Sequence, residues 1–498
     1  MPAHTDLITE QPRPGATVVS PPVGPLDPYV PSVAKPWNAR RVAHLYRRLG
    51  FGATLDQIQQ GLLMSPSDLV DQLLDNAANL TQPPAPAWAN EPQNPGNAIV
   101  EEQRRSMRHL WLEGMLGEGV RAKMAFFWHN HFVTKLLVYG CNAYLWSYYD
   151  LLHRYAFGNF REFTLEMGKN PAMLVFLNGN VNVVGEPNEN YARELMELFT
   201  MGEGNGYTQA DVVEMARALT GWTASFNDCT PPAFDPARFD NNPKTIFGKT
   251  DNFNFDSAHY LIFSERAEEV SRFVTGKIYK HFLYPTTFYP VIEGLAQTFR
   301  DNNWELLPVY KQLFKSEHFF DEQFFSSKIK SPMDVLLPLL KSAGAKYPDH
   351  VKPEWWDDIS FYAQRLGQEL FGPPNVAGWK EHRTWVNEST LTGRWNYAAL
   401  ITQFLQQNDQ LKDNLRTIAK TLTNNSKDPA VITAALTEFY LRQELDAVQQ
   451  QAAVLYFKSS IPENYFTNGT WNLDWDEAPG QIINLLIFLA KLPEFQLT

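Results

Sequence analysis

The sequence predicts an all-α fold: a large multi-helical body with an irregular insertion and an extended N-terminal arm. Three observations predict it. Apolar residues recur at helical spacing over most of the 498 residues, which is the pattern of amphipathic helices. Serine, threonine or asparagine residues precede many of these segments and glycines follow them, as at helix ends. No strand–helix–strand alternation and no glycine-rich phosphate loop occur.

The chain is expected to begin with an arm and to continue as short helices. Residues 1–36 are rich in proline and lack a helical period, so an extended segment is predicted there. Asn38 stands at the cap position of a helix over residues 39–49. The next two helices are expected to open at Thr54 and at Ser65 or Ser67.

The middle of the chain combines strong helical patterns with one region that has none. A long helical stretch covers residues 97–155, and a second strong helix covers residues 187–201. Residues 224–264 contain turn residues and aromatics without a helical period, which predicts an irregular insertion with room for a short hairpin. Further helices are expected over residues 209–220, 265–282, 286–302, 304–316, 329–344, 355–370 and 396–457. The predicted regions are therefore the arm (1–36), a helical region (37–223), the insertion (224–264) and a helical C-terminal region (265–498).

Composition excludes several classes of partner. The net charge of −12 argues against nucleic acid and anionic membrane as main partners. The longest apolar run, residues 482–490, is interrupted by Asn484 and is far shorter than the ~20 residues of a membrane span. The first residues lack the basic and apolar stretches of a secretory signal, so a cytoplasmic location is the default expectation. With two cysteines, Cys141 and Cys229, a reducing compartment or no redox role is the default.

The most distinctive predicted helix carries Glu189, Arg193 and Glu197 four residues apart on one face. Asn190 and Glu194 lie on the neighbouring stripe. Apolar residues cover much of the remaining circumference, so part of the charged face is expected to be buried. Two carboxylates around a guanidinium suit acid–base chemistry or metal binding. The same residues equally suit a structural Arg–Glu network between helices.

A pair of histidines is the second candidate. On a regular helix the rings of His129 and His131 point roughly 200° apart, so both bind one metal only at a helix end or a distortion. Standard di-iron and zinc-protease spacings are absent. One interpretation is a divalent metal held by His129, His131 and Glu197. The other is that one imidazole faces the Glu189 helix and the other is satisfied in the core.

An aromatic segment over residues 371–396 is predicted to be a rigid loop. Trp379, Trp385 and Trp395 suit stacking on sugar faces, with Arg394 as a hydrogen-bond donor. Packing of the loop onto the core is the alternative.

Six motifs follow one another along the chain, at residues 45–52, 127–132, 188–202, 218–222, 328–332 and 374–379. Together they resemble the bacterial "domain of unknown function 1800" family, from about Arg40 to the C-terminus. The resemblance implies a helical protein without a settled activity. Members of the family often accompany a second family that is related to sulfatases and alkaline phosphatases, which implies polymer or ester metabolism at the cell envelope.

One position departs from the family pattern. Asp240 and Lys244 match it, but Phe239 stands where the family has a histidine. If that imidazole is a metal ligand or a general base in the family, this chain lacks the function or performs it differently.

Two classes of function remain open. The first is a hydrolase of a glycan or an ester that uses acidic and histidine residues, with a polysaccharide, a small-molecule ester or a sulfatase-like protein as partner. The second is a non-catalytic helical scaffold or glycan-binding protein with a buried Arg–Glu network. In the enzyme interpretation the catalytic residues are Glu189, Arg193 and Glu194, the substrate contacts are Asn188, Asn190, Trp222, Asp240, Lys244, Trp379 and Arg394, and the metal ligands are His129, His131 and Glu197.

Overall fold

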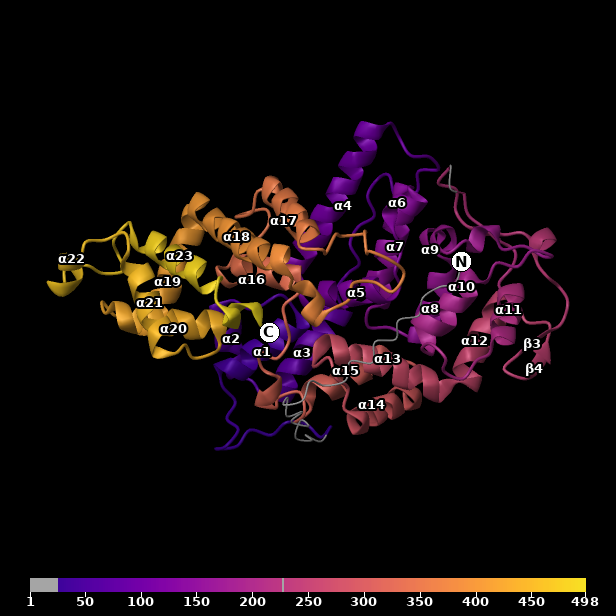
Figure 1. The fold of residues 1–498 in the computed structure, drawn as a ribbon, viewed down its shortest axis with the longest axis horizontal. Coiled ribbons are helices and arrows are strands. Elements are labelled where there is room, and N and C mark those ends of the chain that lie inside the picture. Colours follow the sequence, from indigo (N-terminus) through magenta and orange to yellow (C-terminus); the bar gives the residue numbers. More distant parts are fainter. Residues whose placement is uncertain (1–25, 226–227) are drawn as a thin grey trace.

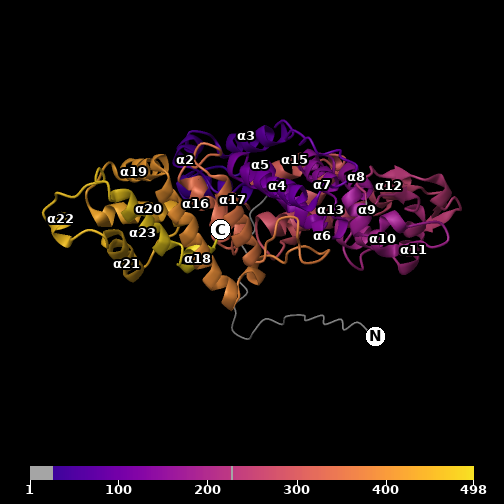
Figure 2. The same ribbon diagram turned by 90° about the horizontal axis from the view of Figure 1, so that it is seen from above.

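The protein is mostly helical, as the sequence predicts. The structure is a computed structural model that describes residues 26–225 and 228–498. Within these residues it contains 23 α-helices and two small two-stranded antiparallel sheets. The molecule is elongated (Figures 1 and 2). Helices from the C-terminal part form one end, and the helices and hairpins between residues 160 and 265 form the other.

The elements follow one another with short connections. The first helices are α1 (Ala39–Leu49), α2 (Leu55–Leu62), α3 (Pro66–Ala78), α4 (Asn97–Gly117), α5 (Val120–His131), α6 (Leu136–Tyr139), α7 (Asn142–Tyr155), α8 (Phe160–Lys169), α9 (Pro171–Phe176), α10 (Glu189–Glu194) and α11 (Gln209–Ala218). The strands are β1 (Trp222–Thr223), β2 (Ala233–Phe234), β3 (Lys244–Ile246) and β4 (Lys249–Asp251). The helices after them are α12 (Phe255–Glu265), α13 (Ala267–Phe282), α14 (Tyr289–Asp301), α15 (Leu306–Lys315), α16 (Pro332–Ser342), α17 (Pro353–Arg365), α18 (Glu388–Phe404), α19 (Asp409–Thr423), α20 (Pro429–Leu441), α21 (Ala447–Lys458), α22 (Glu463–Thr467) and α23 (Ala478–Leu489).

The predicted helix caps account for several of these starts. Asn38 Oδ1 accepts a hydrogen bond from Arg41 N at the start of α1. Thr54 and Gln57 form a capping box at α2, and Thr208 and Asp211 form one at α11. Each cap satisfies backbone N–H groups that have no partner inside the helix. The helix starts predicted from these residues are therefore confirmed.

Two long predicted helices are divided in the structure. Residues 97–155 form α4 to α7. Gly119 (φ +65°) separates α4 from α5 and Gly140 (φ +67°) separates α6 from α7, both with the positive φ that glycine allows. The helix predicted over residues 187–201 begins as α10 and continues as a π-helical turn, η2 (Leu195–Thr200). Wide π turns are uncommon and often mark functional positions.

Two segments predicted to be irregular are in part helical. The predicted insertion ends before residue 255, because Asn254 and Ser257 form a capping box that opens α12. Asn387 and Thr390 form another at α18, so Arg394 lies on a helix rather than in an aromatic loop. The expected hairpin is present, since β3 and β4 pair antiparallel with Ile246 opposite Lys249.

The predicted arm lies mainly outside the described residues, which begin at residue 26. Its described part docks on the body, where Tyr29 is buried and its N–H donates to Lys315 O at 2.7 Å. An exposed ion pair joins Lys35 to Glu317 at 2.9 Å.

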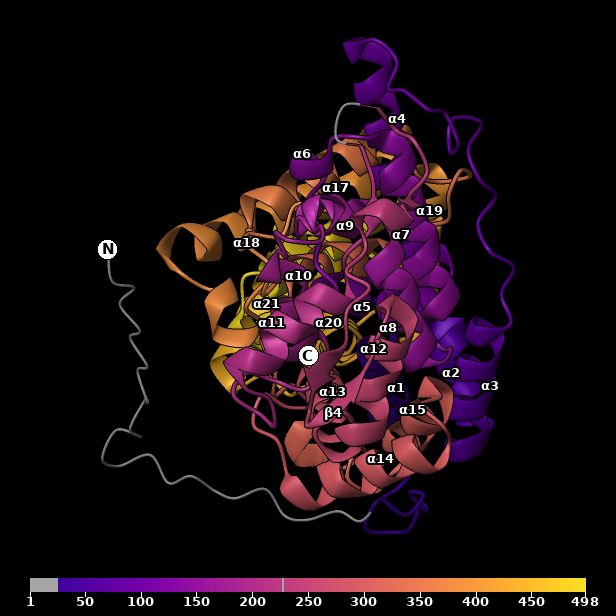
Figure 3. The same ribbon diagram turned by 90° about the vertical axis from the view of Figure 1, so that its right-hand side faces the viewer.

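Two parts of the chain that are distant in sequence meet in the middle of the molecule. The C-terminus returns beside α1 (Figure 1), where Arg48 Nη2 donates to Thr498 O at 2.9 Å. Figure 3 shows the molecule from the end that carries α8 to α12. One continuous apolar core runs through the described residues. None of their helices has the length and apolar character to cross a membrane.

Candidate functional site

The charged residues of α10 form a network at the surface. Arg193 Nη2 lies 2.8 Å from Glu189 Oε2, and Arg193 Nη1 lies 3.2 Å from Glu197 Oε1. Gln209 on α11 closes the network by accepting from Arg193 at 2.8 Å and donating to Glu189 at 2.8 Å. The side chains of Arg193 and Glu189 are 35% and 37% exposed. The charged face is therefore buried only in part: Arg193 and Glu189 reach solvent, whereas the Glu197 side chain is 19% exposed.

Glu194 differs from its neighbours on the same helix. It is half-buried and has no hydrogen-bond partner among the described residues. Burial raises the pKa of its carboxyl, and the nearby charge of Glu197 raises it further. A raised pKa suits a general acid, and the catalytic role of Glu194 stays a prediction.

The Asn188 and Asn190 side chains have different surroundings. Asn188 caps α10 by accepting from Asn190 N at 3.0 Å, and its own N–H donates to Asn182 Oδ1 at 2.8 Å. Asn190 is exposed. A cap role explains Asn188 without a ligand.

His129 and His131 both lie in the core and point to different partners. His129 Nδ1 lies 2.7 Å from the Tyr148 hydroxyl, and His131 Nε2 lies 2.9 Å from Phe199 O. Burial lowers the pKa of His129 to about 3 and that of His131 well below its usual range, so both rings are neutral at pH 7. Glu197 is paired with Arg193 instead. Among the described residues there is no group of three His, Cys, Asp or Glu side chains placed to hold a metal ion.

Asp240 and Lys244, the insertion residues that match the family pattern, form a separate ion cluster with Arg217 of α11. Asp240 Oδ2 accepts from Arg217 Nε at 2.7 Å. Burial alone would raise the pKa of Asp240, but Arg217 and Asn242 hold it down to about 2. Lys244 donates to Asp240 O, and its Nζ lies 4.4 Å from the centre of the Phe239 ring. Phe239 thus supports the lysine by a cation–π contact at the position where the family pattern has a histidine.

Trp222 lies beside this cluster and not in it. Its ring packs against Phe234 and Phe255, and Lys169 Nζ lies 5.6 Å from the ring centre. It is partly exposed, so a face remains accessible for contact.

Trp379 and Arg394 lie away from the α10 network. The Trp379 ring is buried against Phe126 and His129, and the backbone N–H of Trp379 donates to Asn130 Oδ1 at 2.6 Å. Gly378 makes this approach possible, because a Cβ there would lie 2.3 Å from Asn130 Oδ1. The close packing fixes the start of the segment that carries Glu381 and His382.

Arg394 is fully buried and reaches the segment before α16. Its Nη2 donates to Lys330 O at 2.7 Å and its Nε to Gln496 Oε1 at 2.8 Å. The residues predicted as one site therefore lie in several places: the α10 surface, the core around His129, the insertion, and the region near Lys330.

A cavity near Lys330 brings together residues that the sequence reasoning did not select. It lies between α1, α5, α13 and α16, and its volume is about 40 Å³, enough for a few water molecules. The charged side chains that line it include Arg48, Lys123, His281, Lys328, Asp334 and Glu381. A second cavity of the same volume adjoins it and shares Arg47, Asp334 and Thr498.

Segments that carry the family resemblance meet at this cavity. Arg47 and Arg48 belong to residues 45–52, and Lys328 and Lys330 belong to residues 328–332. Glu381 and His382 follow the residues 374–379 motif directly. The lining residues are scattered through the chain, so no spacing pattern could reveal the cavity. The one indication in the sequence is that Arg47, Arg48, Lys328 and Lys330 stand next to apolar residues in these two motifs.

An imidazole–carboxylate pair lies on the cavity wall. His281 Nδ1 is 2.5 Å from Glu381 Oε1, and Lys328 Nζ is 3.6 Å from Glu381 Oε2. Burial opposes ionisation of Glu381, but the neighbouring His281 and Lys328 side chains hold its pKa down to about 2. Burial lowers the pKa of His281. The pair is therefore a neutral imidazole bonded to an ionised carboxylate at neutral pH.

Strained backbone accompanies this pair. His382 adopts φ +64°, a conformation that non-glycine residues seldom occupy. Its Nδ1 accepts from Ile329 N at 3.2 Å, which joins it to the lysine-bearing segment. Such strain is found preferentially at functional sites.

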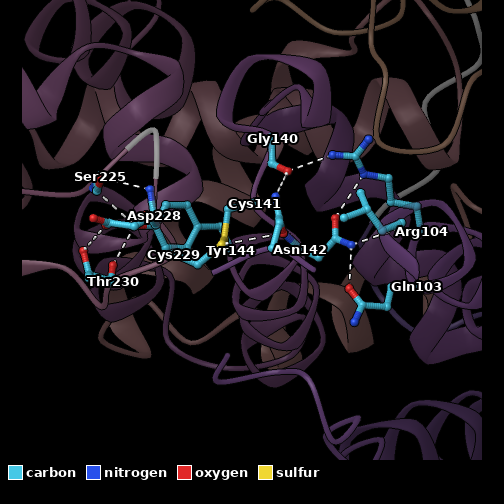
Figure 4. The surroundings of a disulfide bond; sticks show 12 residues. Gln103, Arg104, Gly140, Cys141, Asn142, Tyr144, Ser225, Asp228, Cys229 and Thr230 are labelled. Atoms are coloured by element: carbon cyan, nitrogen blue, oxygen red, sulfur yellow. Dashed lines mark hydrogen bonds between the residues drawn. A yellow bond between two sulfur atoms is a disulfide. The ribbon is translucent and has the colours of Figure 1, made fainter. Parts of the chain in front are cut away.

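The two cysteines form a disulfide, Cys141–Cys229, across 88 residues of sequence (Figure 4). The bond ties the start of α7 to the insertion. Around it, Tyr144 donates to Thr230 O at 2.6 Å and Arg104 donates to Gly140 O at 2.7 Å. The sequence alone offered no reason to pair these cysteines, and the fold brings them together.

Comparison with known proteins supports the resemblance and adds no named function. Neither the curated proteins nor the solved structures include a match to the chain. The model of one family, described as "Protein of unknown function (DUF1800)", matches residues 44–497. Because the match spans nearly the whole chain and includes the motifs that form the cavity, this protein belongs to the DUF1800 family.

Proposed function

We propose that this protein is a hydrolase that acts on an ester, with its acid–base group in the interior cavity. One observation carries the proposal. His281 Nδ1 lies 2.5 Å from Glu381 Oε1 on the cavity wall, and Nε2 of the same ring has no hydrogen-bond partner among the described residues. A carboxylate that orients an imidazole and leaves its second nitrogen free is the arrangement of a general base.

The protonation states support that role. A lowered pKa keeps His281 neutral at pH 7, and an ionised Glu381 accepts a hydrogen bond only from a protonated Nδ1. The lone pair then resides on Nε2, where it can take a proton from water. The carboxylate stabilises the imidazolium that forms.

The cations of the cavity suit the remaining step. Water loses a proton to His281 Nε2 and its oxygen attacks the ester, which places negative charge on an ester oxygen. Lys328 and Arg48 line the same cavity and would stabilise that charge. The bond to the alcohol then breaks, and His281 returns the proton to the leaving oxygen. The family resemblance supports an ester of polymer or envelope metabolism as the substrate class.

The second candidate is a non-catalytic helical scaffold or glycan-binding protein. The saturation of the α10 network favours it, since Arg193 is bonded to Glu189, Glu197 and Gln209 together. A network with every ion paired holds helices together without a ligand. In this candidate the acid–base pair in the cavity is also structural.

The location of the protein follows from a different feature. We propose that it folds in an oxidising compartment, because the Cys141–Cys229 bond would not persist against cytosolic reductants. Detection of the disulfide in protein isolated from its native cells under alkylating conditions supports this location. Free thiols at both cysteines contradict it.

Hydrolysis of model esters tests the hydrolase directly. The parent and the His281→Asn variant are compared on p-nitrophenyl acetate, phosphate and sulfate. The proposal predicts turnover of at least one ester by the parent and a loss of about 100-fold or more in the variant. His109→Asn is the matched control, because His109 pairs with Asp357 at 2.8 Å outside the cavity. A folded parent that hydrolyses none of the esters favours the scaffold.

A second pair of variants compares the two candidate sites. Glu381→Gln removes the charge that orients His281, whereas Glu194→Gln removes the perturbed acid of α10. Circular dichroism confirms folding of each. The proposal predicts that Glu381→Gln lowers kcat much more than Glu194→Gln. A larger loss of kcat in Glu194→Gln than in Glu381→Gln would instead assign the acid–base role to Glu194.

A further inference from the structure

The interior cavities contain more positive than negative side chains. Six side-chain cations line the two adjoining cavities: Arg47, Arg48, Lys123, Lys328, Lys330 and Arg442. Two side-chain carboxylates, Asp334 and Glu381, line them. Five of the eight residues are buried (Arg48, Lys123, Lys328, Lys330 and Arg442), and Arg47, Asp334 and Glu381 are partly buried. An imbalance of this kind is costly in the interior unless a negative group compensates it.

Both carboxylates are already engaged. Asp334 Oδ1 lies 2.5 Å from Lys123 Nζ, and Asp334 Oδ2 accepts from Ser331 Oγ at 2.8 Å. Glu381 is bonded to His281 and lies close to Lys328. Of the remaining cations, Arg48 donates to Thr498 O, the last residue of the sequence, which lines both cavities. Arg47, Lys330 and Arg442 have no carboxylate side chain of their own on the cavity walls.

Several of these cations retain unused donors. Arg48 is 3% exposed, and its Nε and Nη1 have no hydrogen-bond partner within the described part of the chain. Its Nη2 alone is bonded, to Phe324 O, Ser327 Oγ and Thr498 O. Arg442 Nε is a further buried donor without a partner there.

Lys330 is the clearest case. It is 5% exposed, and its ammonium makes no hydrogen bond or ion pair with any described residue. Its Nζ lies 4.0 Å from the centre of the Phe495 ring. Burial and the neighbouring charge of Arg47 lower the pKa of Lys330 well below its usual range. A bound anion would supply the missing partner.

We propose that the two adjoining cavities bind a tetrahedral oxyanion, the phosphate or sulfate group of the substrate. Donors reach the cavities from α1, from the segment before α16 and from the end of α20, so they approach from several sides. A group with three or four terminal oxygens accepts hydrogen bonds from several sides at once, whereas a planar carboxylate accepts in one plane. The surplus of cations over carboxylate side chains favours a group with more than one negative charge.

This inference deepens the proposed function. It rests on the hydrolase for the statement that the anion belongs to a substrate, and it names that substrate as a phosphorylated or sulfated ester. The anion would lie next to the His281–Glu381 pair, since Arg48 and Lys328 line the same cavity as the pair. The binding itself is measurable without turnover.

Binding of inorganic phosphate and of inorganic sulfate, each measured by calorimetry and by thermal shift at constant ionic strength in chloride, tests the inference. The parent is expected to bind at least one of them and to melt several degrees higher in its presence. Lys330→Met is expected to lose at least tenfold in affinity. Its melting temperature without anion should equal or exceed that of the parent, because the change removes an uncompensated buried charge.

Matched variants separate the site from general charge effects. Lys412→Met removes an exposed lysine that pairs with Asp409, and it should leave anion binding unchanged. Arg442→Gln provides a second variant of the cavity if Lys330→Met does not fold. Equal binding by the cavity variants and Lys412→Met overturns the proposal. Stabilisation by chloride or acetate equal to that by phosphate and sulfate also overturns it.

The two proposals fail in different ways. His281→Asn should still bind phosphate or sulfate, because its ring is not among the proposed donors. Anion binding without hydrolysis of any ester leaves the oxyanion site standing and removes the hydrolase. Hydrolysis that neither phosphate nor sulfate inhibits, in a protein that binds neither, leaves the hydrolase standing and removes the oxyanion site.

Discussion

The α10 surface and the interior cavities use charged residues in opposite ways. On α10, Arg193 has three partners and is 35% exposed. In the cavities, Arg48 is 3% exposed and two of its three guanidinium nitrogens have no partner among the described residues. A surface ion whose hydrogen bonds are all made needs no ligand, whereas a buried ion with unused donors indicates a site for one. The difference favours the interior cavities over the α10 surface as the functional site.

Acidification should have the largest effect, because it charges histidines that the fold holds neutral. Burial lowers the pKa of His129 and of His153 to about 3, below the 6.5 of an unfolded chain. Between those values the unfolded state binds more protons, so stability falls as pH falls below 6.5. Each histidine lowers the free energy of unfolding by about 1.4 kcal/mol for every pH unit of acidification between pH 6.5 and its folded-state pKa.

Urea unfolding at pH 7, 5.5 and 4.5 measures this effect. His153→Leu should flatten the pH dependence, because both ring nitrogens of His153 are buried without partners among the described residues. A free energy of unfolding that is constant from pH 7 to pH 4.5 would show that these rings are accessible to protons in the folded state.

Removal of an interior carboxylate should be the next largest effect. Asp334→Asn leaves Lys123 without its 2.5 Å partner and adds to the surplus of positive charge. The expected loss of stability is about 3–5 kcal/mol. Asp357→Asn is the surface counterpart, where Arg105 and His109 lose a half-exposed partner and the expected cost is below about 1 kcal/mol. Chemical denaturation that gives both variants the same cost would remove the contrast between interior and surface.

Reduction of the disulfide should have an intermediate effect on the insertion. The bond closes a separation of 88 residues, and a disulfide typically contributes about 2–4 kcal/mol to stability. The melting temperature is measured with and without dithiothreitol. The double variant Cys141→Ser/Cys229→Ser should melt as the reduced parent does and should not respond to the reductant. A parent that does not respond either would show that the cysteines are not bonded.

The surface network should be the least sensitive. Arg193→Ala removes three hydrogen bonds, but the charges that remain are accessible to water, so the expected cost is about 1 kcal/mol or less. Thermal denaturation of the variant measures it. A loss of ~3–5 kcal/mol would show that the network is effectively buried, as the sequence alone suggested.

The fold was predictable where local signals decide it. Capping residues such as Asn38, Thr54 and Thr208 mark helix starts independently of tertiary structure. The breaks at Gly119 and Gly140 were not predicted, because a glycine in a periodic segment is compatible with both a continuous and a divided helix. The start of α18 was missed because aromatic residues obscured the capping box at Asn387.

The site was less predictable, for a physical reason. The α10 network depends on contacts four residues apart, and its Arg193 pairs with Glu189 and Glu197 could be read from spacing. The pair His281–Glu381 is separated by 100 residues and forms only when α13 and the segment after Trp379 meet. Whether a charged residue is buried depends on the whole fold, so Lys330 could not be distinguished from a surface lysine beforehand.

A crystal structure with bound tungstate, a heavy tetrahedral oxyanion, tests the central claim most directly. The account predicts an anomalous peak in one of the two adjoining cavities, within hydrogen-bond distance of Arg48 or Lys330. The same soak of Lys330→Met should show a weaker peak or none there. Cavities that hold no anion at saturating tungstate, or a peak at Arg193 on the surface instead, would contradict the claim that the interior cations form a functional site.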